Sequence, residues 1–201
     1  MIAVSTLSFV AMSAGIVGSA PVAAPLPAVP VDTACIVQNP RGLANRASPL
    51  DSVSFQVSGH LVKICYGRPS ARGRTMIGGN AVPFGKLWRT GANEPTLIHT
   101  TVPLSIAGID VEPGIYSLYT VPWENEWRVI VNRSTSQWGR ENTYTAEIEA
   151  QEVGRGSAAS EQMGDHVETF TIRAESSENG ATVFLEWENT RVPIPLTATD
   201  S

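Results

Sequence analysis

The first 31 residues of this 201-residue chain contain no charged side chain, and Asp32 is the first. Acidic residues are also absent between Ser52 and Asn93, where six basic residues occur. From Glu94 onward there are 17 acidic residues and only six arginines, so the net charge of −5 averages two opposite regions. An overall acidic chain is not expected to bind nucleic acids. The hydrophobic content of 42% and the five tryptophans exclude a disordered protein.

The sequence contains only two cysteines, Cys35 and Cys65. In an exported chain such a pair most simply forms one disulfide, and the alternative is two unrelated thiols. A bridge would close a loop of about 30 residues and stabilise the fold by roughly 3–4 kcal/mol. The spacing matches no zinc-binding pattern, so we predict neither a metal nor a cofactor.

The N-terminus is an apolar run from Ile2 to Gly18 that has the length and small residues of a secretory signal peptide. It lacks the usual Lys or Arg before the apolar core, so an uncleaved membrane anchor and a misassigned start site stay open as alternatives. Only Pro, Ala and Val occur from Pro21 to Pro30, which is typical of an extended spacer. We expect export to the periplasm or the extracellular space, with membrane contact only through an uncleaved leader.

The remainder of the chain has the alternation of apolar and polar residues that is typical of β-strands. We predict one all-β domain, an antiparallel β-sandwich that is jelly-roll-like or barrel-like, with one long ordered irregular loop. The clearest alternation runs from Tyr144 to Ala150, and at most two short helices are expected, at Phe84–Trp88 and Ser157–Met163. The predicted segments are a leader and spacer (1–31), a flexible lead-in (32–46), the domain (47–196) and a disordered tail (197–201).

The expected strands begin around the apolar residues that alternate along the chain. They are centred on residues 53–57, 62–66, 97–102, 115–121, 127–131, 144–150, 170–172, 183–187 and 192–194. Residues 122–126 and 178–180 are expected to be hairpin loops. Residues 67–93 are the exception, because they contain six glycines and show little alternation. Their apolar residues indicate that this loop packs against the sandwich.

The same loop carries a family resemblance. Residues 67–79 read GRPSARGRTMIGG and residues 82–94 read VPFGKLWRTGANE. Together with residues 113–118, 126–127, 137–139 and 187–193, these strings resemble the bacterial family called domain of unknown function 2911. The similarity extends from about Ala47 to about Leu196. The resemblance implies an exported envelope protein with one β-rich domain, and it implies no assigned activity.

Four arginines on the loop suggest an anion site, since guanidinium groups bind carboxylates and phosphates and glycines expose backbone N–H groups. They are Arg68, Arg72, Arg74 and Arg89. The alternative is that they hold the loop to the acidic strands that follow. No glycine-rich phosphate loop ending in Lys-Ser or Lys-Thr is present.

The end of the loop contains residues that could act in acid–base catalysis or in sugar binding. Glu94 beside Asn93 is a candidate general base or sugar-binding pair, with His99 on the next strand close enough to assist. The alternative is an ion pair of Glu94 with Arg89 or Arg74 and a turn stabilised by Asn93. No nucleophile motif of the G-x-S-x-G type supports a serine hydrolase.

The tryptophans also allow carbohydrate binding, because flat aromatic faces stack on sugar rings. Trp127 and Trp187 alternate with core residues, whereas Trp123 and Trp138 fall in expected loops, where an exposed ring is more suggestive.

Our interpretation is a binding protein for a small anionic or carbohydrate ligand. Arg68, Arg72, Arg74 and Arg89 would supply charge, Asn93 would orient the ligand and Trp88 would form a wall. A hydrolase with Glu94 and His99 is the first alternative, and a structural or partner-binding module is the second. The sequence does not decide whether the protein is an enzyme, and it does not indicate the oligomeric state.

Overall fold

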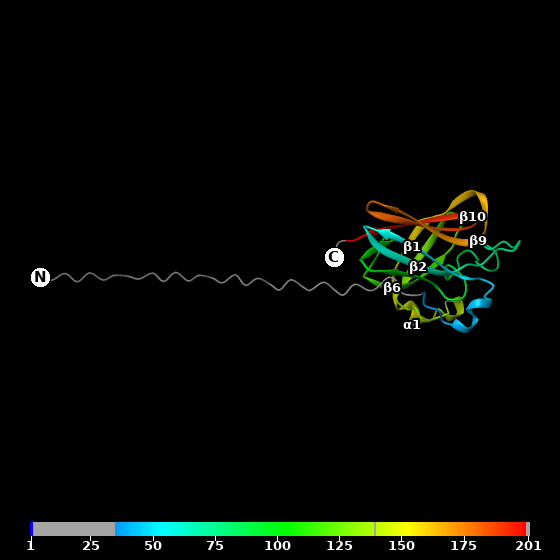
Figure 1. The fold of residues 1–201 in the computed structure, drawn as a ribbon, viewed down its shortest axis with the longest axis horizontal. Helices are drawn as coiled ribbons and strands as arrows, with labels where there is room; N and C mark the ends of the chain where they lie inside the picture. Colours follow the sequence, from blue (N-terminus) through cyan, green and yellow to red (C-terminus); the bar gives the residue numbers. More distant parts are fainter. Residues whose placement is uncertain (2–34, 139, 200–201) are drawn as a thin grey trace.

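The computed structural model describes Met1 and residues 35–138 and 140–199. Apart from Met1, the predicted leader and spacer lie outside the described residues. No helix among the described residues is long and apolar enough to cross a membrane. The prediction of an all-β sandwich is confirmed, because the chain forms two open antiparallel sheets and no closed barrel (Figure 1).

The larger sheet has six strands, and each pairs with its neighbours in an antiparallel sense. In spatial order these are β1 (Leu50–Val57), β2 (His60–Gly67), β3 (Thr96–Thr100), β6 (Gly114–Val121), β7 (Glu126–Asn132) and β8 (Glu152–Ala159). The smaller sheet has the order β5 (Ile109–Val111), β4 (Leu104–Ile106), β10 (Gly180–Ala198) and β9 (Glu161–Ser177). Short turns join most consecutive strands, as the predicted hairpin loops at residues 122–126 and 178–180 require.

The helices differ from the sequence-based prediction. The described residues contain only two short 3₁₀ turns, η1 (Pro40–Asn45) and η2 (Glu141–Thr143), and one short helix, α1 (Ala146–Glu149). The predicted helix at Phe84–Trp88 is an irregular turn, and the one at Ser157–Met163 lies within β8 and β9. The predicted strand at Tyr144–Ala150 is wrong, because α1 occupies it. Ala and Glu are good helix formers, and this segment connects β7 to β8 without a strand beside it.

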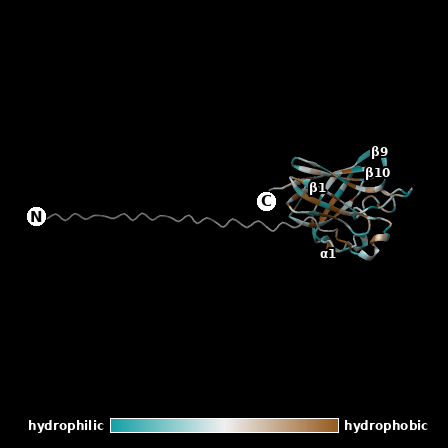
Figure 2. Cartoon of the chain, viewed as in Figure 1, coloured by the Kyte–Doolittle hydropathy of each residue, from teal (hydrophilic) through white to brown (hydrophobic). Residues whose placement is uncertain are grey.

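The core lies between the two sheets, where the apolar faces of the strands meet. Figure 2 shows the hydrophobic residues concentrated between the layers and hydrophilic ones on the outer surface of β9 and β10. The irregular loop contributes to this core through Trp88, whose ring lies 5.0 Å from Phe170, 5.8 Å from Trp187 and 5.9 Å from Trp127. The loop is therefore packed against both sheets, as its apolar content predicted.

The outer face of the larger sheet is covered as well. Residues 35–46 and the connection from 133 to 151 lie on the side of β2 and β6 that faces away from β9 and β10 (Figure 1). Cys35 is joined to Cys65 on β2 by a disulfide. We call residues 35–46 the strap. Because the strap is fixed to the sheet, these residues differ from the expected flexible lead-in.

The C-terminal boundary also differs from the expected one. β10 continues to Ala198, where it pairs with Leu104 of β4, so the strand extends two residues beyond the predicted end of the domain at Leu196. The backbone hydrogen bonds of β4 supply the reason, since this short strand needs residues 197 and 198 as its partners.

Candidate functional site

Two exposed aromatic side chains, one from the irregular loop and one from a neighbouring turn, line the same part of the surface. Trp123, in the turn between β6 and β7, is 54% exposed, and Phe84 of the loop is 37% exposed. Both line two adjoining hollows of about 440 and 480 Å³, which together we call the aromatic groove. Isolated exposed aromatic residues need no explanation, but two rings lining one groove indicate a binding surface.

Two glycines hold these rings in place. A Cβ atom on Gly85 would lie 2.8 Å from the Trp123 ring, and one on Gly78 would lie 2.6 Å from the Phe84 ring. Both glycines also have positive φ angles of 71° and 75°, which other residues adopt only with strain. The rings therefore rest directly on backbone, and any larger side chain at either glycine would displace them.

Backbone hydrogen bonds fix the two walls that carry the rings. The Gly85 N–H donates to the carbonyl of Pro122, at 2.9 Å, which ties the loop to the turn beneath Trp123. On the opposite side, both carboxylate oxygens of Glu188 accept main-chain N–H groups of the loop, from Met76 at 3.0 Å and from Ile77 at 2.8 Å. The groove is therefore preformed.

Polar side chains surround the aromatic pair. Gln162, Asn125 and Thr190 line the groove, and none of them makes a side-chain hydrogen bond with another described residue. Amide and hydroxyl groups of this kind both donate and accept hydrogen bonds. The charged residues of the lining are Glu124, Glu126 and Glu188. The groove thus offers flat apolar surfaces, free hydrogen-bonding groups and negative charge.

Two of the predicted ligand-binding arginines are engaged with the protein itself. Arg68 forms an ion pair with Asp51 at 3.1 Å, and it also donates to Thr171 Oγ1 at 2.9 Å and to the Phe170 carbonyl at 3.2 Å. Arg72 donates to the carbonyl of Ala47 at 3.1 Å. These contacts attach the loop to β1 and β9.

Arg74 and Arg89 bind main-chain carbonyls. Arg74 donates to Ala71 at 2.9 Å and to Ser70 at 3.1 Å, within its own turn. Arg89 Nη1 donates to the carbonyls of Asn93 and Trp138. The four arginine side chains therefore have separate partners among the described residues. The one carboxylate among these partners belongs to Asp51, which precedes the loop, and not to the acidic strands that follow.

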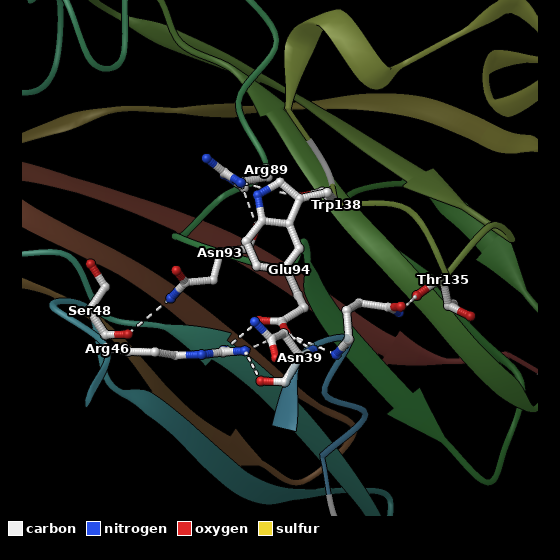
Figure 3. Close-up of polar contacts among 9 residues, drawn as sticks. Asn39, Arg46, Ser48, Arg89, Asn93, Glu94, Thr135 and Trp138 are labelled. Atoms are coloured by element: carbon white, nitrogen blue, oxygen red, sulfur yellow. Dashed lines mark hydrogen bonds and ion pairs between the residues drawn. The ribbon is translucent and has the colours of Figure 1, made fainter. Parts of the chain in front are cut away.

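The carboxylate of Glu94 is held by hydrogen bonds from residues of the strap (Figure 3). Arg46 donates to both of its carboxylate oxygens, at 2.6 and 2.7 Å, and the two side chains are only 6% and 8% exposed. The main-chain N–H of Gln38 adds a hydrogen bond of 2.9 Å. Burial opposes ionisation of Glu94, but the hydrogen bonds from Arg46 and the backbone outweigh it, so the pKa of this carboxyl is lowered.

This geometry does not favour Glu94 as a general base. A base needs a pKa near the working pH and an open path to its substrate, and Glu94 has neither. Asn93 stabilises the turn instead, because its side chain donates to the Ser48 carbonyl at 3.0 Å and its φ of 67° suits asparagine. The sequence suggested a Glu94 ion pair with Arg89 or Arg74, and the partner is Arg46.

His99 lies on the same outer face of the larger sheet. The cavity beside it has a volume of about 20 Å³, enough for about one water molecule, and Cys35, Lys63 and Leu97 line it. Burial lowers the pKa of His99, and the positive charge of Lys63 lowers it further. No group of three metal-ligating side chains occurs among residues 35–138 and 140–199.

Comparison with known protein families identifies the family of this chain. The model of a family described as a protein of unknown function, DUF2911, matches residues 48–196. The chain belongs to the DUF2911 family. Searches of curated proteins and of solved structures gave no match. The family assignment therefore confirms the resemblance and leaves the activity open.

The strings that carry the DUF2911 resemblance take two different places in the fold. Residues 88–94 close the loop onto the core and the strap through Trp88, Arg89 and Glu94. In contrast, the strings at 67–79, 82–94 and 187–193 each supply lining residues to the aromatic groove, among them Ile77, Phe84 and Thr190. Three strings of the family pattern thus meet at the groove.

The groove residues were only partly visible in the sequence. Trp123 is recognisable as an aromatic residue in a predicted turn, and we expected it to be exposed. Phe84 was assigned to packing, because an apolar residue in a loop gives no sign of which side it faces. Nothing in the sequence around Gln162 or Thr190 indicates a binding site. These two residues become neighbours only because β9 pairs with β10.

Proposed function

We propose that this DUF2911 protein is an exported module that binds carbohydrate in the aromatic groove. The observation that carries the proposal is the exposed pair of Trp123 and Phe84 beside polar side chains that form no side-chain hydrogen bond with another described residue. The apolar faces of a sugar ring stack on aromatic rings, while the hydroxyl groups at its edge need donors and acceptors. The groove supplies both the aromatic rings and the hydrogen-bonding groups.

The negative charge of the groove limits the kinds of sugar that it can bind. Its lining contains Glu124, Glu126 and Glu188 and no Lys or Arg. A sugar acid would be repelled there, so we expect a neutral or amino-substituted sugar. The carbohydrate half of the sequence-based hypothesis is therefore retained, and its site moves from the arginines to the aromatic residues of the same loop.

Export is supported by two observations. The uncharged N-terminal run has the character of a signal peptide, and Cys35 and Cys65 form a disulfide, a bond that persists mainly in oxidising compartments. A sugar-binding module outside the cytoplasm would meet glycans of the envelope or of the surroundings.

The experiment is a thermal-shift and calorimetric screen with chitotriose, cellotriose and maltotriose, with a trigalacturonate as the acidic control. A sugar at 100 times its Kd should stabilise the protein by roughly 2.7 kcal/mol. Trp123→Ala should weaken binding at least tenfold, because stacking and its buried area are lost. Leu61→Ala, which removes another exposed apolar side chain away from the groove, is the matched control and should bind like the wild type.

Two results would overturn the proposal. The first is the absence of any shift with every neutral or amino sugar, which would favour the structural or partner-binding alternative. The second is equal binding by the wild type and Trp123→Ala, which would place the sugar elsewhere. A hydrolase would instead turn over a chromogenic glycoside, with activity lost in Glu94→Gln while the fold is retained.

A further inference from the structure

A second hollow opens on the other side of the loop. It has a volume of about 220 Å³ and lies between the loop and Arg140. Its lining combines two arginines, one amide and four apolar side chains, namely Arg89, Arg140, Asn80, Ala81, Pro83, Leu87 and Trp88. Residues of the aromatic groove do not line it. It is therefore a separate cavity.

Neither guanidinium group forms an ion pair with a carboxylate of the described residues. Arg89 gives its hydrogen bonds to two neutral carbonyls through Nη1, and Nε and Nη2 have no acceptor among the described residues (Figure 3). Arg140 forms no side-chain hydrogen bond or ion pair with a described residue. Glu94, the acid nearest to Arg89 in sequence, accepts hydrogen bonds from Arg46 and acts on Arg89 through its charge alone.

The pKa of Arg89 agrees with this arrangement. Burial lowers it and the charge of Arg140 lowers it further, while Tyr119 and Glu94 raise it by less. Two cations that raise each other's energy beside a cavity are stabilised when an anion enters, because the anion attracts both and accepts the unused N–H groups.

We propose that the Arg89–Arg140 pocket binds a small anion through a carboxylate or phosphate group. The guanidinium of Arg89 and the exposed guanidinium of Arg140 would bind the oxygens, and Asn80 would donate a further hydrogen bond. The volume is below the range of about 300–1,000 Å³ that holds drug-sized ligands, so the ligand is small or enters by one charged end. The apolar wall of Pro83 and Leu87 accommodates a short carbon chain better than a bare ion.

The test is isothermal titration calorimetry with inorganic phosphate, succinate and phenyl phosphate at constant ionic strength. The three probes separate the sources of the oxyanion and show whether the apolar wall contributes. Arg140→Gln removes one charge from an exposed position and should weaken binding about tenfold or more. Arg128→Gln removes the same charge from an exposed position on β7, outside the pocket, and should leave the affinity within twofold.

The result expected is saturable binding of at least one probe by the wild type and by Arg128→Gln, with the loss confined to Arg140→Gln. The proposal is overturned if no probe binds, or if both variants bind equally well. Circular dichroism of each variant verifies the fold, and neutral sugars should bind Arg140→Gln as they bind the wild type, because the aromatic groove is separate.

Discussion

At the residue scale, burial and pairing decide what each charged side chain does. Glu94 was predicted as a base or as half of an ion pair, and its partner proved to be Arg46, which lies 48 residues earlier in the sequence. Sequence spacing indicates that Glu94 follows a basic loop, but it contains no information on which arginine the folded strap brings over it. Arg72, Arg74 and Arg89 likewise donate to carbonyl groups, whose positions depend on the path of the backbone.

The Arg46–Glu94 pair gives a prediction about stability and pH. Glu94→Gln should destabilise the protein at pH 7 by about 3 kcal/mol, because it leaves Arg46 buried without its counter-charge. The folded-state pKa of Glu94 is lowered from 4.5, so its stabilisation is fully present above that value and is lost as the pH falls through the folded pKa. Urea unfolding at about pH 7 and about pH 3 measures both effects.

A matched control separates this pair from general acid effects. Glu149→Gln removes a carboxylate that is 58% exposed and paired with Arg155, and it should cost less than about 1 kcal/mol. The variant Glu94→Gln should also lose less stability than the wild type on acidification. An equal loss on acidification in the two proteins would show that another group controls the pH dependence.

At the element scale, the alternation of apolar residues predicted most strands, because each sheet has one face in the core. It failed at Tyr144–Ala150, where alternate apolar residues occur without a neighbouring strand. Tyr144 instead turns onto Tyr119, with ring centres 4.9 Å apart, and donates to Glu152 at 2.6 Å. The strap was also missed, since a short polar segment after a proline-rich spacer looks like a linker until its disulfide and ion pair are known.

The strap should depend on its covalent anchor. The double variant Cys35→Ser, Cys65→Ser opens a loop of about 30 residues and should lose roughly 3–4 kcal/mol of stability. Hydrogen exchange at Gln38, whose N–H donates to Glu94, should become faster, because the strap can then open locally. Unchanged exchange at Gln38 would mean that the Arg46–Glu94 pair holds the strap without the disulfide.

At the scale of the whole molecule, the irregular loop is part of the core that joins the two sheets. Trp88 contacts Trp127 of β7 in one sheet and Phe170 and Trp187 of the other. Its main chain also pairs with Thr120 of β6, through hydrogen bonds of 2.7 and 2.9 Å, just beyond Leu118, where the pairing of β6 with β3 ends. The sequence indicated that the loop is ordered, but a string without alternation cannot show that it lies between two layers.

This position predicts a sharp contrast between two tryptophans of the same region. Trp88→Ala should destabilise the protein by about 3–5 kcal/mol, because it leaves a cavity where the loop meets both sheets. Trp123→Ala should cost little stability, since its ring lies on the surface, although it should lose sugar binding. Near-ultraviolet and far-ultraviolet circular dichroism in urea should give one coincident transition for Trp88→Ala, since the loop and both sheets unfold together. Two separate transitions would show that the loop opens independently of the sandwich, and in that case the aromatic groove would rest on a mobile wall.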